Sequence, residues 1–320
     1  MGFGMDLARS YYYEELKPLL SDQFPNEFQY MAIGLVGHGS ECYGYDDRFS
    51  ADHDYGKRAM IFLPREIFKV KGREIFACVE EHTSGQCDVM SIGAFYKLIL
   101  ANEVGPQTND EWIYLRESAL STASNGEVFI DNLGEFTRIR ENLLAYYPED
   151  VRKYKLAHQL FKMAQSGQYN YQRSIKRKEL SAAKIAEADF IRHACMAVHM
   201  LNKRYCPYYK WSTRSLKDLP ILGAAVETLL NRLNNVELRV AKELSDKGEF
   251  SHITVFEEVS KRKIAIFEQV SNMIISYLIE SGLSSASSDF LLDHAVSVKN
   301  SIEDRAIRDL SIYAEGLEVR

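Results

Sequence analysis

A short apolar run followed at once by a glycine-rich segment is the feature that most restricts how this chain can fold. Residues 31–36, MAIGLV, are too few and too continuously apolar for an amphipathic helix, so they predict a buried β-strand. Gly37 and Gly39 follow, and glycine permits the positive φ angles and close backbone approach of a tight turn. The pattern therefore predicts a strand that ends in a turn, where a ligand phosphate can lie on the N–H groups around Ser40.

Two aspartates stand at the head of the next expected strand. Asp52 and Asp54 are separated by one residue, and the period of two in a strand directs both carboxylates to the same face. Such a pair repels unless a cation lies between its members, and Mg²⁺ is commonly held by one or two carboxylates plus substrate phosphates. Asp-x-Asp also occurs by chance where a loop leads into a strand. Its place 12 residues after Ser40, behind a strand and a glycine turn, favours the metal site.

A third acidic candidate follows in the next segment. We expect residues 74–81 and 86–92 to form two strands joined by a tight turn, as a β-hairpin. Asp88 falls in the middle of the second strand, where burial of a lone charge is costly and a ligand role would explain it. The alternative is a solvent-facing Asp88 on a half-exposed strand, in which case Glu80 and Glu81 remain as ligands.

These residues resemble the signature of a known superfamily. The shared positions are Gly39-Ser40, Gly44, Ser50 and Asp52-x-Asp54. They are similar to the motif of nucleotidyltransferase-fold proteins, which include the kanamycin, streptomycin and lincosamide nucleotidyltransferases and the minimal nucleotidyltransferases. The fuller pattern, with Asn-x-x-Tyr-x-Pro-Tyr-x-Lys-Trp starting at Asn202, resembles more closely a bacterial family of this fold described only as a domain of unknown function. The resemblance covers nearly the whole chain.

The resemblance implies Mg²⁺-dependent or Mn²⁺-dependent transfer of a nucleoside monophosphate, AMP from ATP, to a hydroxyl of an acceptor. Asp52 and Asp54 would hold two metal ions, and Asp88 would bind the acceptor-side ion and accept the proton of the hydroxyl. Gly39 and Ser40 would hold the β- and γ-phosphates. The acceptor itself, small molecule or macromolecule, has no motif in the sequence.

Two segments in the second half of the chain carry candidate cations. Arg173 and Arg177 lie four residues apart near a helix start, so they share a face and can grip phosphate, although a solvated basic helix end explains them equally well. Lys210 lies between Tyr209 and Trp211. We expect its side chain to be half-buried among these rings and to neutralise a triphosphate.

Spacing alone leaves two choices open. The general base is Asp88, Glu179 or Glu187, because some members of the superfamily place their base on a C-terminal helix. The alternative to an enzyme is a non-catalytic nucleotide-binding regulatory or antitoxin-like partner protein of the same fold. The intact acidic pair and Ser40 favour the enzyme.

The character of the chain changes near residue 146, from short strands to long amphipathic helices. The prediction is an α+β fold, with a nucleotidyltransferase-like mixed sheet and flanking helices in residues 1–146. Residues 147–320 would form an all-α bundle, which in the resembled proteins is the other wall of the cleft. The expected helices of the bundle are approximately 148–166, 176–204, 214–246, 252–282 and 286–314.

Composition limits the surroundings and partners of this chain. With 320 residues, 46% of them hydrophobic, it can bury a large core. A net charge of −6 provides no global basic field, so non-specific binding to DNA or to an anionic membrane is not expected. The sequence contains neither a signal-peptide pattern nor an apolar run of about 18 residues, which predicts a cytoplasmic protein. The sequence does not predict the oligomeric state.

Overall fold

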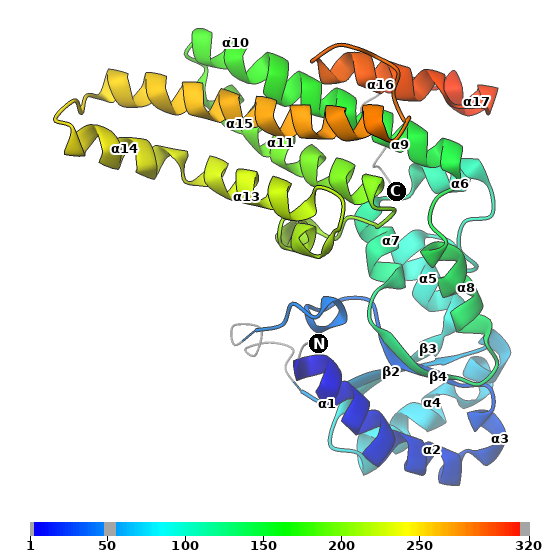
Figure 1. The fold of residues 1–320 in the computed structure, drawn as a ribbon. Helices are drawn as coiled ribbons and strands as arrows, with labels where there is room; N and C mark the ends of the chain where they lie inside the picture. Colours follow the sequence, from blue (N-terminus) through cyan, green and yellow to red (C-terminus); the bar gives the residue numbers. More distant parts are fainter. Residues whose placement is uncertain (1–2, 48–55, 314–320) are drawn as a thin grey trace. The chain divides into compact units, whose positions relative to one another are not determined.

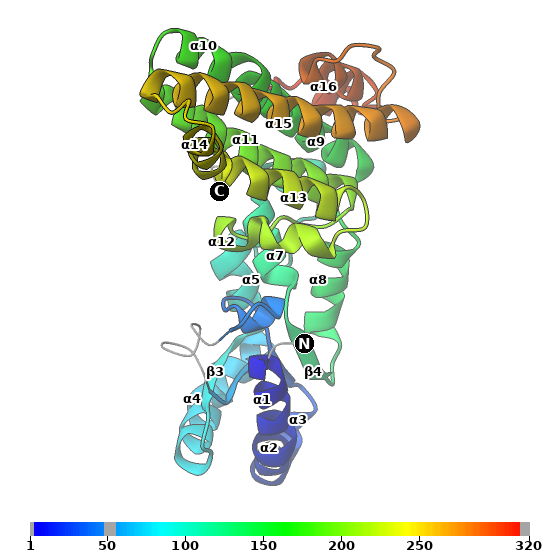
Figure 2. The same ribbon diagram turned by 60° about the vertical axis from the view of Figure 1, so that its left-hand side comes forward.

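The computed structural model describes residues 3–47 and 56–313. The predicted metal ligands Asp52 and Asp54, and Ser50 of the signature, therefore lie outside the described residues. The chain divides into two compact units, one that extends to Tyr146 and one that begins at Tyr147. Each unit has its own arrangement of elements, which Figures 1 and 2 show from two directions.

The first unit contains a mixed four-stranded sheet, which confirms the expected α+β class. The strands are β1 (Ala32–Leu35), β2 (Arg58–Leu63), β3 (Gln86–Ser91) and β4 (Glu127–Asp131). Their spatial order is β3-β2-β1-β4, so β3 and β4 are the edges. β1 pairs antiparallel with both of its neighbours, whereas β2 and β3 run parallel. The buried strand expected before the glycine turn is thus β1, at the centre of the sheet.

The predicted hairpin before Asp88 is wrong. Residues 74–81 belong to helix α4 (Arg65–His82), which connects β2 to β3. A tight turn cannot join parallel strands, because the last residue of one strand and the first residue of the next lie at opposite ends of the strands. A crossover helix is the usual connection. Ile75 and Val79, four residues apart, are both buried, as expected for the apolar stripe of a helix.

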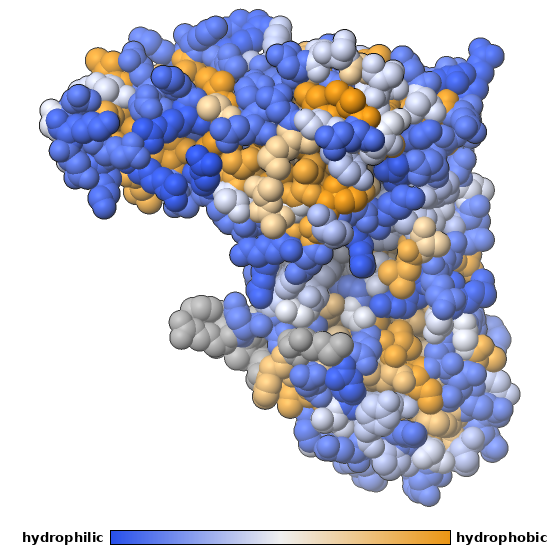
Figure 3. All heavy atoms as spheres, viewed as in Figure 1, coloured by the Kyte–Doolittle hydropathy of each residue, from blue (hydrophilic) through white to orange (hydrophobic). Residues whose placement is uncertain are grey.

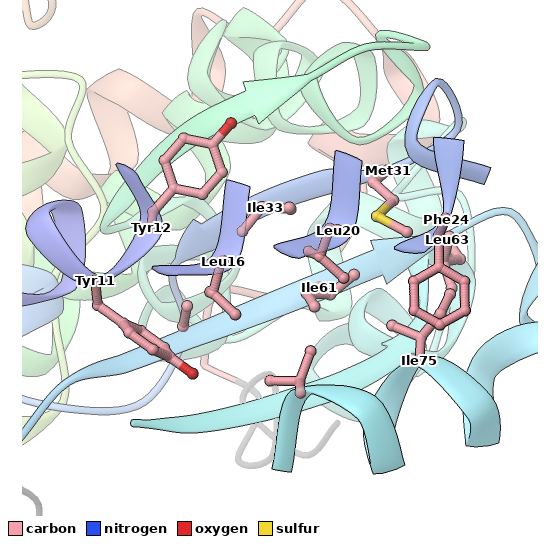
Figure 4. Close-up of a cluster of buried hydrophobic side chains, with 12 residues drawn as sticks. Tyr11, Tyr12, Leu16, Leu20, Phe24, Met31, Ile33, Ile61, Leu63 and Ile75 are labelled. Carbon is pink, nitrogen blue, oxygen red and sulfur yellow. The ribbon is translucent and has the colours of Figure 1, made fainter. Parts of the chain in front are cut away.

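Helices cover both faces of this sheet (Figure 1). Besides α4, the helices of this unit are α1 (Phe3–Tyr11), a π-helical turn (Tyr12–Leu16), α2 (Lys17–Gln23), α3 (Pro25–Phe28), α5 (Ile92–Leu100), α6 (Asn109–Tyr114), α7 (Glu117–Ser124) and α8 (Glu135–Leu144). Against one face, Tyr11, Leu16 and Leu20 pack on Ile33 and Ile61 (Figure 4). Against the other, the ring of Phe62 stacks on Phe136 at 4.4 Å between centroids. Ile61 and Phe62 serve different faces because successive strand residues alternate.

The second unit is helical throughout its described residues, as expected. Its helices are α9 (Glu149–Met163), the π-helix η4 (Ala164–Asn170), α10 (Tyr171–Lys176), α11 (Leu180–Leu201), α12 (Tyr209–Ser212), the 3-10 helix η5 (Arg214–Asp218), α13 (Gly223–Asn234), α14 (Val236–Asp246), α15 (His252–Glu280), α16 (Leu291–Asn300) and α17 (Arg305–Arg308). The helices expected over 214–246 and 286–314 are each broken into shorter pieces. No described helix combines the length and the apolar character that a membrane span requires.

The core of the helical unit combines apolar packing with a buried ion-pair cluster. Phe190 of α11 and Phe267 of α15 have their ring centroids 4.6 Å apart. Lys263, also on α15, is buried, and its Nζ lies 2.9 Å from Glu187 Oε2 and 3.1 Å from Glu237 Oε1. The space-filling view in Figure 3 shows apolar side chains gathered where α13 and α15 run beside each other, with hydrophilic ones around them.

Candidate functional site

The turn after β1 has the backbone geometry that the sequence predicts. Gly37 has a φ of 90° and Gly39 a φ of 128°, a region that residues with a Cβ rarely adopt. The chain then enters a single 3-10 turn, Glu41–Tyr43, which the Ser40 side chain does not cap. Among the described residues, the backbone N–H groups of positions 38–41 find no acceptor. Free N–H groups of this kind are able to donate to an anion.

A segment far away in the sequence holds this turn in place. Gly37 N–H donates to Asn125 Oδ1 at 2.7 Å, and Asn125 Nδ2–H donates to the Gly37 carbonyl, also at 2.7 Å. The N–H of Gly126 donates to the Cys42 carbonyl at 2.9 Å. Arg140 of α8 donates to the carbonyls of Asn125 and Gly126, at 2.6 and 3.0 Å. Sequence reasoning missed Asn125 and Arg140, because neither stands in a motif.

A cavity of about 590 Å³ opens beside this turn within the first unit. Gly37 and His38 of the turn, Arg58 of β2 and Asp88 of β3 all line it. Asp88 lies opposite Met60 in the parallel register, which places it on the same sheet face as Met60. The structure therefore brings the predicted third carboxylate to the cavity that the glycine turn borders.

The surroundings of Asp88 and its substitutes differ from the prediction. Asp88 is exposed, so the expectation of a buried charge in mid-strand is wrong; β3 is an edge strand and leaves this position open to solvent. Glu80 and Glu81 lie on α4 and not on a strand. Glu80 lines the cavity together with Asp88, whereas Glu81 does not.

Two carboxylates near the turn carry oxygen atoms without hydrogen bonds. Glu41 is only 7% exposed, and its Oε1 lies 3.3 Å from Arg58 Nη2 but makes no hydrogen bond. Asp46 accepts the Gly4 N–H on Oδ2 at 2.8 Å, while its buried Oδ1 has no partner among the described residues. A Cβ added at Gly39 would come within 2.6 Å of Glu41 Oε1, so a larger residue there would have to displace this carboxylate.

These oxygen atoms bear on the predicted metal. Buried carboxylate oxygens without donors are costly, and they are the hard ligands that Mg²⁺ and Mn²⁺ prefer. Within residues 3–47 and 56–313, no three His, Cys, Asp or Glu side chains are grouped so that they could hold a metal ion. A site in this region therefore fits the donor chemistry of the chain only if Asp52 and Asp54 contribute to it.

Cys42 lies within the 3-10 turn of this site, yet its thiol is poorly suited to be a nucleophile. Its side chain is buried, and its Sγ lies 3.6 Å from the His38 carbonyl, to which it donates. Burial raises the pKa of the Cys42 thiol to about 12. The thiol is therefore protonated near neutral pH, and the thiolate is the reactive form.

Lys210 is more exposed than predicted. It lies on the single turn of α12, and its side chain is exposed, with Nζ 5.0 Å from the centroid of the Trp211 ring. Neighbouring Tyr209 is also exposed, so the expectation that these rings half-bury Lys210 is wrong. The contact of Lys210 with a triphosphate stays a prediction.

The other candidates of the helical half occupy different surroundings. Arg173 and Arg177 line a second cavity, whose lining residues all belong to the helical unit. Glu187 pairs with Lys263, its Oε2 2.9 Å from Lys263 Nζ, an arrangement that leaves the carboxylate little freedom to act as a base. Glu179 is exposed and precedes the first residue of α11.

One segment of the chain matches a known family, and the fold has a similar solved structure. Residues 112–212 match the family model described as a domain of unknown function, DUF4037. No curated protein matches the chain. Among solved structures, the chain is similar to a nucleotidyltransferase-like protein from Exiguobacterium sibiricum 255-15, with a TM-score of 0.36 and 11% identity over 90% of this chain and 88% of the other. The family match includes Lys210 and the arginines at 173 and 177, but not the glycine turn or Asp88.

Proposed function

We propose that this protein is a nucleotidyltransferase that moves a nucleoside monophosphate, AMP from ATP, to a hydroxyl of an acceptor. One observation carries the proposal. Gly37 and His38 of the turn after β1 and Asp88 of β3 lie 50 residues or more apart in sequence, yet all three line one cavity. The free N–H groups of positions 38–41 suit phosphate oxygens, and the Asp88 carboxylate suits the removal of a proton.

Each residue of the site has a part in this reaction. Backbone N–H groups of the turn at Gly39 and Ser40 donate to the phosphate oxygens of the triphosphate. The Ser40 hydroxyl, which makes no capping bond, donates to the same group. The guanidinium of Arg58, at the cavity wall, adds positive charge.

The bond changes follow the usual course of phosphoryl transfer. The acceptor hydroxyl attacks the α-phosphorus in line, and a new oxygen–phosphorus bond forms. The bond from the α-phosphorus to the oxygen that bridges to the β-phosphate breaks, and pyrophosphate leaves. Asp88 accepts the hydroxyl proton, so charge and atoms balance.

Asp52, Asp54 and Asp88 are the proposed ligands of Mg²⁺ or Mn²⁺ in this site. The buried Asp46 Oδ1, which has no hydrogen-bond partner among the described residues, supports the presence of a cation nearby. When bound, such an ion supplies positive charge against the phosphate oxygens and the leaving pyrophosphate.

The test of this function is a thermal-shift measurement on Asp52→Asn and Asp54→Asn. ATP with Mg²⁺ should raise the melting temperature of the wild type and leave both variants unchanged, because the metal needs the carboxylates. Without metal, in EDTA, each variant should be at least as stable as the wild type, since removal of one charge from the pair relieves repulsion. If ATP and Mg²⁺ stabilise the variants as much as the wild type, the metal assignment is wrong.

A crystal soaked with Mn²⁺ and a non-hydrolysable ATP analogue separates the enzyme from a regulatory protein. The enzyme requires metal between Asp52 and Asp54, with the α-phosphate accessible from the side of Asp88. Nucleotide bound without metal at these residues would instead favour a nucleotide-binding regulatory protein of the same fold.

A further inference from the structure

The helical unit contains a strongly basic cavity of about 610 Å³, lined only by residues between Lys162 and His193. Its charged lining consists of Lys162, Arg173, Arg177, Arg192 and Asp189. Four cations against one carboxylate leave a formal charge of +3 in a chain whose net charge is −6. His193, which also lines the cavity, is neutral near pH 7, because burial lowers its pKa to about 3. The cavity therefore attracts anions although the protein as a whole does not.

The positive charge is only partly compensated within the protein. Arg192 Nη2 lies 2.8 Å from Asp189 Oδ1, and the Arg173 guanidinium lies 4.7 Å from the centroid of the Tyr169 ring, with a hydrogen bond to its hydroxyl. Lys162 and Arg177 have no acidic partner among the described residues. Two cations at one cavity without a counter-charge raise the free energy of the unliganded state, and an anion between them lowers it.

An unusual element shapes this cavity. Gln165, Ser166 and Asn170 of the lining belong to η4, a π-helix of seven residues. π-helical segments are rare, and they occur frequently at functional sites. Within η4, Gly167 lets α11 pack closely, because a Cβ at that position would overlap the ring of Phe190. The wall is thus a built part of the fold and not a chance gap between exposed side chains.

Part of the lining that α11 contributes is apolar, beside its charged residues Asp189 and Arg192. This apolar part consists of Ala182, Ile185 and Ala186, and Ile185 is 64% exposed. An exposed isoleucine beside four cations suits a ligand that has both an anionic and an apolar part. A free inorganic anion would use only the basic wall.

We propose that this cavity binds a small phosphate ester, with the phosphate held by Lys162, Arg173 and Arg177 and the organic part against Ile185. Charge-assisted hydrogen bonds from arginine forks recognise phosphate well, and the apolar wall selects esters over inorganic phosphate. The site is complete within the helical unit and needs no metal. It is therefore independent of the proposed nucleotidyl transfer and assigns the two arginines a ligand of their own.

The experiment is calorimetric titration of AMP and of inorganic pyrophosphate into the full-length protein in EDTA, which silences the metal-dependent site. One saturable site is expected for each probe. Arg177→Gln should weaken both by about tenfold or more, because it removes a charge-assisted contact to phosphate. Lys176→Gln is the matched control: it removes the same charge from the neighbouring exposed residue, which does not line the cavity, and should bind as the wild type does.

Two further variants make the outcome specific. Ile185→Ser should weaken AMP several-fold and leave pyrophosphate unchanged, because only AMP has an organic part. Asp52→Asn should leave both probes unchanged. The proposal is overturned if neither probe saturates, if Arg177→Gln and Lys176→Gln lose affinity equally, or if Asp52→Asn abolishes binding in EDTA. The three described positions, Lys176, Arg177 and Ile185, are exposed and tolerate exchange without loss of core packing, and melting curves check that each variant is folded.

Discussion

Asp88 is the proposed third ligand of the metal site, and Glu80 is the alternative. Both carboxylates line the cavity beside the glycine turn, but Asp88 stands on β3 and Glu80 on α4. Both are exposed, so neither carries a folding cost that would itself explain its presence.

We predict that Asp88→Asn removes one tightly bound Mn²⁺ in a titration with a non-hydrolysable ATP analogue, while Glu80→Gln binds as the wild type does. Neither change should lower the free energy of unfolding by more than about 0.5 kcal/mol, because both side chains are exposed. Electron paramagnetic resonance of free Mn²⁺ measures the stoichiometry. Loss of the ion in Glu80→Gln alone would transfer the role of third ligand from Asp88 to Glu80.

At the scale of elements, the glycine turn after β1 depends on the start of β4. Gly126 has a φ of 67°, and a Cβ there would overlap the Leu35 carbonyl, so a glycine is required where the chain passes the end of β1. Asn125 and Arg140 then connect this crossing point to the turn and to α8. The conformation of the turn therefore depends on residues far away in the sequence, although the glycines that permit it lie close together in the chain.

Gly126→Ala should therefore destabilise the first unit strongly, and Gly134→Ala is its matched control. Both glycines have positive φ, 67° and 75°, but a Cβ at Gly134 meets nothing within 4 Å. Gly134→Ala should cost about 1–2 kcal/mol, the strain of a left-handed residue with a Cβ. Gly126→Ala should cost a further 1–3 kcal/mol, as expected for a strained functional backbone. Urea denaturation of both variants gives the difference, and equal costs would show that the crossing at Leu35 relaxes freely.

At the scale of the whole molecule, buried histidines couple stability to pH. His199 is 2% exposed; its Nδ1 lies 2.7 Å from the Cys195 carbonyl and its Nε2 lies 2.8 Å from Ser215 Oγ. Burial lowers the pKa of His199 to about 4, from an ordinary 6.5. The unfolded chain therefore binds a proton between these two values while the folded chain does not, so stability is complete above pH 6.5 and is lost as the pH falls towards 4.

We predict that His199→Gln flattens this loss. In the wild type, the free energy of unfolding should fall by up to about 1.4 kcal/mol per pH unit for this histidine between pH 6 and 4.5. The variant should be less stable at pH 7, because it loses two buried hydrogen bonds, but its slope should be smaller by that amount. His82→Gln, at an exposed histidine, should keep the wild-type slope. Urea midpoints at several pH values decide the matter, and parallel slopes for all three proteins would contradict the assignment.

The sequence by itself determined the features that rest on local pattern. Six consecutive apolar residues before two glycines indicate a buried strand and a turn, and the long amphipathic repeats after residue 146 indicate helices. Both signals are local, because hydrophobic periodicity and the backbone freedom of glycine depend only on residues close together in the chain. Only the tertiary structure decided that β2 and β3 run parallel around α4, that Asp88 is exposed, and that Asn125 holds Gly37 from 88 positions away. Strand partners, edge positions and cavities are made by residues distant in the chain, and the free energy that selects them is the packing of the whole unit, which no local window contains.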